Sequence, residues 1–128
     1  MQPPAPLLAL SLGVLLHLVG CSGGSRAEPV EWAVIEEPNG TTYQLRARFG
    51  GSSCTEFEEW QVEETNARVE VQAIVTFTGG ADDECTADLV FEPHTLRLSA
   101  PLGSRELIGC DPPEDRRDCT EVIPPRIT

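Results

Sequence analysis

Apolar and polar residues alternate through most of the chain after residue 30. Successive side chains of a β-strand point to opposite faces, so a period of two predicts strands with one buried face. No window of the sequence has the apolar stripe of an amphipathic helix. We therefore expect an all-β domain, with a first strand around residues 30–36 and a short strand at 60–62. The clearest alternation covers residues 43–49, 69–77, 87–91 and 96–102.

Turn residues separate these segments. Pro38-Asn39-Gly40 favours a tight hairpin turn, and Gly50-Gly51-Ser52-Ser53 and Gly79-Gly80-Ala81-Asp82-Asp83 favour longer loops. Glu92-Pro93-His94 is expected to break one strand from the next. Several short strands spaced by turns predict a small sandwich or a partly open barrel.

The N-terminus has a different character. An apolar run extends from Leu7 to Val19 and is followed at once by Gly20-Cys21 and a Ser/Gly-rich segment. About a dozen apolar residues are too few to span a bilayer core, which needs roughly 20. That length is typical of the central region of a secretory signal peptide. The segment before the run carries no Lys or Arg, which departs from the usual signal.

Leu18-Val19-Gly20-Cys21 resembles the lipobox of bacterial lipoproteins. The resemblance implies a diacylglyceryl group on Cys21, cleavage before it and acylation, such as palmitoylation, of the new amine. Two or more acyl chains hold a protein stably on a membrane. On this interpretation residues 1–20 are a cleaved signal peptide, residues 21–29 a flexible tether and residues 30–128 a single domain. The domain would be anchored at the outer face of the cell membrane.

The sequence contains five cysteines. Assigning Cys21 to lipid leaves Cys54, Cys85, Cys110 and Cys119, which allow three pairings. We favour Cys54–Cys85 and Cys110–Cys119, the latter because Pro112-Pro113 helps to bend the short loop back on itself. Chain-entropy estimates give a stabilisation of about 3.7 kcal/mol for the longer loop, closed by Cys54–Cys85, and about 2.7 kcal/mol for the shorter one, closed by Cys110–Cys119. A zinc site is the rival reading, but zinc usually needs close Cys-x-x-Cys pairs, which this sequence lacks.

The region from Gly50 to Arg105 resembles small secreted or lipid-anchored proteins of actinobacteria. The resemblance rests on four stretches and implies an all-β domain in which Cys54 is joined to Cys85, with nothing about chemistry. The loop bounded by Cys110 and Cys119 departs from that pattern. The four stretches are Gly50-Gly51-Ser52-Ser53-Cys54, Val62-Glu63-Glu64-Thr65, Cys85-Thr86 and Leu96 through Arg105.

The chain is strongly acidic, with a formal net charge of −12 and no Lys. Phosphate binding needs a basic face, so nucleic acid is an unsuitable partner. Adsorption to anionic lipid headgroups is disfavoured for the same reason. Attachment to a membrane would therefore have to be covalent.

Few side chains offer catalytic chemistry. His94 is the only histidine after residue 20, and no nucleophile elbow, metalloprotease motif or phosphate-binding loop is present. Glutamates 56, 58, 59, 63 and 64 surround Trp60, and a carboxylate pair beside an aromatic is found in glycosidases. A solvated strand face explains the same pattern. Asp82-Asp83-Glu84 and the acidic residues at 111, 114, 115 and 118 could supply oxygens to calcium, but neither matches an EF-hand loop.

The sequence thus predicts no catalytic, metal or cofactor site. We expect an extracytoplasmic module that binds a protein, a wall polymer or a small solute, with Trp60 as a possible exposed contact. Two alternatives stay open. The first is a small hydrolase that uses the glutamates around Trp60, and the second is a freely secreted disulfide domain without lipid on Cys21.

Overall fold

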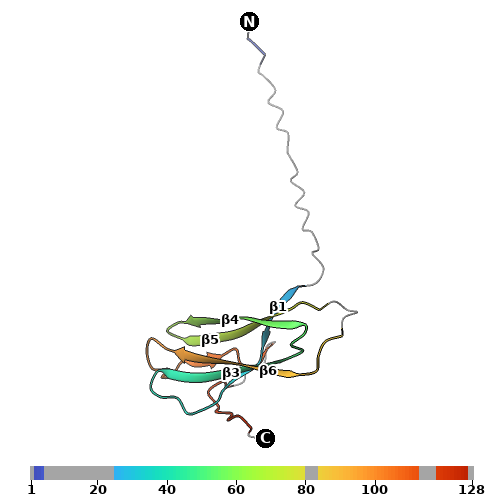
Figure 1. The fold of residues 1–128 in the computed structure, drawn as a ribbon. Coiled ribbons are helices and arrows are strands. Elements are labelled where there is room, and N and C mark those ends of the chain that lie inside the picture. The colour runs from blue at the N-terminus through green and yellow to red at the C-terminus, as the bar shows by residue number, and fades with distance from the viewer. Residues whose placement is uncertain (1, 5–24, 80–83, 113–117, 127–128) are drawn as a thin grey trace.

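The computed structural model describes residues 2–4, 25–79, 84–112 and 118–126. These residues form two β-sheets that lie face to face and are not closed into a barrel, so the fold is a β-sandwich (Figure 1). The predicted all-β fold with two disulfides is confirmed. The strands are β1 (Arg26–Val30), β2 (Trp32–Val34), β3 (Thr42–Gly50), β4 (Thr55–Glu64), β5 (Arg68–Phe77), β6 (Leu89–Arg97) and β7 (Glu106–Ile108).

Each sheet is built around one long central strand. In the first sheet, β5 pairs antiparallel with β4 on one side, and on the other side antiparallel with β1 and parallel with β7. In the second sheet, β3 pairs antiparallel with β2 and β6. The chain passes from one sheet to the other at Glu31, the single residue between β1 and β2. Strands β4 and β6 are therefore edge strands of different sheets.

The apolar faces of the two sheets meet in one core. The alternation read from the sequence is present in β3 and β5, where every second side chain from Tyr43 to Phe49 and from Val69 to Val75 is buried. The indole nitrogen of Trp32 donates to the carbonyl of Val71 at 2.9 Å, so its one polar atom is satisfied inside the core. The core comprises Trp32, Val34, Tyr43, Leu45, Ala47, Val69, Val71, Ala73, Leu96, Leu98, Leu107, Cys110 and Cys119.

The start of the folded domain differs from the prediction. Residues 26–29, assigned to a flexible tether, pair with β5 as part of β1, from Arg26 opposite Phe77 to Val30 opposite Ala73. The boundary at residue 30 was therefore wrong. Pro29 and Glu28 hide the strand pattern, but proline is tolerated at the edge of a sheet, where a missing N–H breaks no ladder.

Two other strands also differ from the sequence pattern. Strand β6 runs without interruption through Pro93, where we expected a break, because β6 is an edge strand. Strand β4 has ten residues instead of the expected three. A β-bulge between Phe57 and Glu59 shifts its register, and this shift removes the simple period of two.

The predicted hairpin turn is present between β2 and β3. Asn39 and Thr42 exchange two backbone hydrogen bonds of 3.0 Å each, with Gly40 and Thr41 between them. Gly40 has a φ of +62°, which favours glycine at that position.

Candidate binding groove

A groove of about 670 Å³ crosses the outer face of the second sheet. Strands β2, β3 and β6 form its floor, and residues 123–126 form one wall. The alternation of β3 turns Arg46 and Arg48 outward, opposite the buried Leu45 and Ala47. Apart from the core residue Trp32, the groove is therefore lined by residues that lie outside the core.

Apolar side chains are unusually exposed in this groove. Within the described ranges, four large apolar side chains are classed as exposed, and three of them line it: Leu89 at 54%, Phe91 at 43% and Ile123 at 38%. The fourth, Val62, lies on β4 in the other sheet. Scattered exposed apolar residues are common, but three that line one concave site are typical of a contact surface.

The wall of the groove is held by the C-terminal segment. The amide of Ile123 donates to the carbonyl of Val34 at 2.7 Å, and Val122 forms a parallel bridge with Val34. Cys119, three residues before Val122, is fixed in the core by its disulfide to Cys110. The disulfide thus positions the segment that covers the free edge of β2.

Three arginines and one glutamate give the groove its charge. Arg48 is paired, since its Nε donates to a carboxylate oxygen of Glu31 at 2.6 Å. The guanidinium carbon of Arg46 lies 4.1 Å from the ring centroid of Phe91, a cation–π contact. Among the described residues, neither Arg46 nor Arg126 has a carboxylate partner. Two positive charges are therefore uncompensated in a groove of a strongly acidic chain.

The glutamates around Trp60 do not converge on a cleft. Glu56, Glu58, Glu59 and Glu63 are exposed along the edge strand β4. None of them lines the groove described above or a second cleft beside Leu107 and Asp118. Charged residues and a bulge on an edge strand hinder pairing with another chain, which gives these carboxylates a structural explanation. Their placement gives the hydrolase alternative no support.

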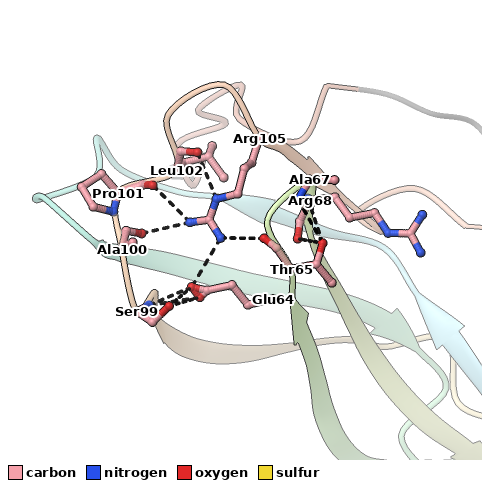
Figure 2. Close-up of polar contacts among 9 residues, drawn as sticks. All are labelled: Glu64, Thr65, Ala67, Arg68, Ser99, Ala100, Pro101, Leu102 and Arg105. Carbon is pink, nitrogen blue, oxygen red and sulfur yellow. Dashed lines mark hydrogen bonds and ion pairs between the residues drawn. The ribbon is translucent and has the colours of Figure 1, made fainter.

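Glu64, the fifth glutamate, belongs to a structural cluster (Figure 2). Its carboxylate accepts hydrogen bonds from the backbone and hydroxyl of Ser99, at 2.7 to 3.0 Å, and lies 3.6 Å from the Arg105 guanidinium. The hydrogen bonds from Ser99 are the main reason that the pKa of Glu64 lies below its ordinary value, with a smaller contribution from Arg105. Glu64 is thus held as a carboxylate.

Arg105 completes this cluster by binding main-chain carbonyls. Its guanidinium donates to the carbonyls of Thr65, Ala100, Pro101 and Leu102 at 3.0 to 3.2 Å. These contacts fasten the loop after β6 to the β4–β5 turn, as Figure 2 shows. Every donor is engaged with the protein itself, so we assign this cluster to stability.

Trp60 is half-buried between the sheets and not an exposed contact, so this expectation was wrong. Its ring packs against His94, Phe57 and Trp32, with centroids 5.0, 5.9 and 6.5 Å away. The indole nitrogen is buried and has no hydrogen-bond partner in the described chain. The bulge in β4 places Trp60 on the same inward face as Phe57, which the flanking charges concealed.

Both favoured disulfides are present. Cys54–Cys85 ties the start of β4 to the segment that precedes β6, and Cys110–Cys119 is buried in the core. The first pair stands beside a polar cluster in which Asp88 accepts hydrogen bonds from the amide of Ser52 and the hydroxyl of Thr86. Hydrogen bonding from the Ser52 side chain, followed by that from the Thr86 hydroxyl and the Ser52 amide, lowers the pKa of Asp88 to about 2.

Several predicted sites fall partly or wholly outside the described residues. Cys21 and its lipobox do, as do Asp82, Asp83, Glu114 and Asp115 of the candidate calcium loops. In the ranges that are described, no group of three or more His, Cys, Asp or Glu side chains is placed to hold a metal ion. The described part of the chain also contains no helix long and apolar enough to cross a membrane.

Comparison with known proteins gives no relative: no family model, no curated protein and no solved structure matches the chain. Function therefore has to be argued from the groove. Sequence reasoning missed this site, although the alternation in residues 43–49 does place Arg46 and Arg48 on the outward face. It gave no sign that Phe91 and Arg126 lie beside them.

Proposed function

We propose that this chain is an exported, lipid-anchored binding module that holds its ligand in the groove on the outer face of the second sheet. The observation that carries the proposal is the concentration of exposed Leu89, Phe91 and Ile123 beside the unpaired Arg46 and Arg126. Exposing apolar side chains in a concave site is unfavourable in water unless a ligand covers them.

Two features support export. Two disulfides form and persist in an oxidising compartment, outside the reducing cytoplasm. The lipobox-like Leu18-Val19-Gly20-Cys21 supplies a signal and an anchor. Because β1 begins at Arg26, the tether shortens to residues 21–25, which span at most about 17 Å when extended.

The position of the groove suits this arrangement. The chain enters the fold at β1, beside the layer of β4 and β5 (Figure 1). The groove is lined by residues of β2, β3 and β6, which form the other layer. An anchor at Cys21 would therefore leave the groove open to the surroundings on the side away from the lipid surface.

The anchor is tested by intact-mass measurement of protein extracted from host membranes, with Cys21→Ser as the matched variant. We expect the wild-type chain to begin at Cys21 and to carry a diacylglyceryl group and an acyl chain. The variant should lack lipid and fail to accumulate in the membrane in processed form. A soluble wild-type chain without lipid would contradict the anchor and favour the freely secreted alternative.

The binding surface is tested by crosslinking in the host with two matched variants. Phe91→Ser and Val62→Ser each replace an exposed apolar side chain, at 43% and 46% exposure, on opposite sheets. We expect Phe91→Ser to lose crosslinked species that Val62→Ser retains, with both variants keeping the wild-type melting temperature within a few degrees. Equal crosslinking by both variants would contradict the groove as the binding surface.

A further inference from the structure

We propose that the groove selects a small solute with an apolar body and one anionic group, a carboxylate or a phosphate. This inference rests on the binding function proposed above and adds the class of ligand. It depends on three features of the groove: the contact that holds Arg46, the charge balance of its lining and its size.

Arg46 is prepared to receive an anion. Its guanidinium lies over the ring of Phe91 at 4.1 Å, and the side chain is half-buried. Stacking on an aromatic ring fixes the plane of a guanidinium and leaves its N–H edge free. That edge matches the two oxygens of a carboxylate or a phosphate and binds them through paired, charge-assisted hydrogen bonds. The exposed part of Phe91 meanwhile offers apolar surface to the body of the ligand.

The remaining charges favour an anion over a cation. Glu31 already neutralises Arg48, whereas Arg126 has no carboxylate partner in the described part of the chain. A ligand cation would meet Arg46 and Arg126 without a free carboxylate in the lining to balance it. A ligand anion would meet two uncompensated guanidinium groups.

The groove also limits the size and total charge of the ligand. A volume of about 670 Å³ lies within the range of roughly 300–1,000 Å³ that is typical of sites for small molecules. The net charge of −12 repels a polyanion, whose charges extend beyond the groove. A single anionic group inside the groove is attracted by the nearest arginines, because screening weakens the effect of the more distant charges. Because the groove opens away from the proposed anchor, we assign the ligand to free solution and not to the bilayer.

The test uses the predicted mature chain, residues 21–128, made with Cys21→Ser so that it carries no lipid, and four probes of equal chain length. Octanoate and octyl phosphate carry the anion, octanol is neutral and octyltrimethylammonium is a cation. Chemical shifts of the Phe91 and Ile123 amides in an NMR titration give the affinity and the location of binding. We expect each anionic probe to bind at least tenfold more tightly than octanol, because charge-assisted hydrogen bonds add about that factor.

Arginine variants make the test specific. Arg46→Gln and Arg126→Gln should each weaken octanoate binding by about tenfold. Arg97→Gln is the matched control, since Arg97 is exposed on β6 but lies outside the groove lining, and it should leave the affinity unchanged. Similar losses in all three variants would show only a general effect of charge and would overturn the proposal.

The other outcomes are also decisive. Equal binding of octanol and octanoate at Phe91 would overturn the anion selectivity while leaving the groove as a binding surface. No binding of any probe at 5 mM, about five thousand times the dissociation constant of a micromolar site, would also overturn the proposal. The crosslinking pair would then still decide the proposed function. Vesicles of phosphatidylglycerol test the lipid source of the anion. If the wild-type protein sediments with them and Arg46→Gln does not, the assignment to a free solute is overturned.

Discussion

The indole of Trp60 stacks on the imidazole of His94, with ring centroids 5.0 Å apart and an angle of 16° between the planes. Trp60 lies on β4 and His94 on β6, so the pair joins the edge strands of the two sheets. Removal from water disfavours the charged imidazole, and burial accordingly lowers the pKa of His94 below its ordinary value of 6.5. This pair therefore links the closure of the sandwich to pH.

The lowered pKa of His94 predicts a loss of stability in acid. Between its folded pKa and 6.5, the unfolded chain binds more protons at this residue than the folded chain does, so the free energy of unfolding falls as pH drops below 6.5. Urea unfolding at pH 5, 6, 7 and 8 measures this dependence. His94→Phe keeps an aromatic ring against Trp60 and should flatten the curve in that range. An NMR titration that places the pKa of His94 at or above 6.5 would contradict this explanation.

Arg105→Lys should destabilise the domain. A lysine ammonium cannot reproduce the planar fork that donates to four carbonyls, so some of these carbonyls lose their charge-assisted hydrogen bond. The expected loss is about 1–3 kcal/mol, which lowers the melting temperature by about 4–8 °C per kcal/mol in a domain of this size. Arg97→Lys is the control, because Arg97 is exposed and should change nothing. Equal melting temperatures for both variants would rule out the role assigned to Arg105.

The two disulfides should be reduced in a fixed order. Cys85 is exposed, whereas Cys110 and Cys119 are both buried in the core. Thiolate attack requires access to a sulfur atom, so mild reductant should open Cys54–Cys85 first and leave Cys110–Cys119 intact until the core opens. Differential alkylation with mass spectrometry measures the order. If Cys119 were alkylated before Cys85, the buried position of the Cys110–Cys119 disulfide would be contradicted.

Gly109→Ala should prevent folding or destabilise the domain severely. Gly109 has a φ of +105°, and a Cβ at this position would lie 2.0 Å from the carbonyl oxygen of Val71. The backbone of β5 cannot move away without disturbing the core around Trp32, which bonds to the same carbonyl. Gly40→Ala is the matched comparison, since its φ is also positive but no atom lies within 4 Å of the added Cβ. It should cost only about 1 kcal/mol. Comparable yields and melting temperatures for the two variants would contradict this difference.

Local patterns predicted the central strands because the burial of β3 and β5 is regular. The alternation between Tyr43 and Phe49 predicts a strand without any information on the strands that pair with it. Edge strands were harder to predict. A bulge shifts the pattern around Phe57 and Trp60, and Pro93 lies inside β6 without ending it. Both irregularities are tolerated because one side of an edge strand makes no ladder.

The groove could be predicted only in part, because its lining comes from distant segments. Arg46 was visible as an outward-facing residue of its strand. Its contact with Phe91 depends on the pairing of β3 with β6, and the covering of β2 by residues near Ile123 depends on the Cys110–Cys119 disulfide. These contacts join residues far apart in the chain, and single-residue preferences carry no information about them.

A photocrosslinking amino acid at position 91 or position 62, in the membrane-bound form in its own host, tests the central claim most directly. Both positions carry exposed apolar side chains, but only Phe91 lies in the groove. We expect a distinct adduct from position 91, weakened by Arg46→Gln, and no adduct from position 62. Adducts from both positions, or none from position 91, would contradict the groove as the functional surface of this protein.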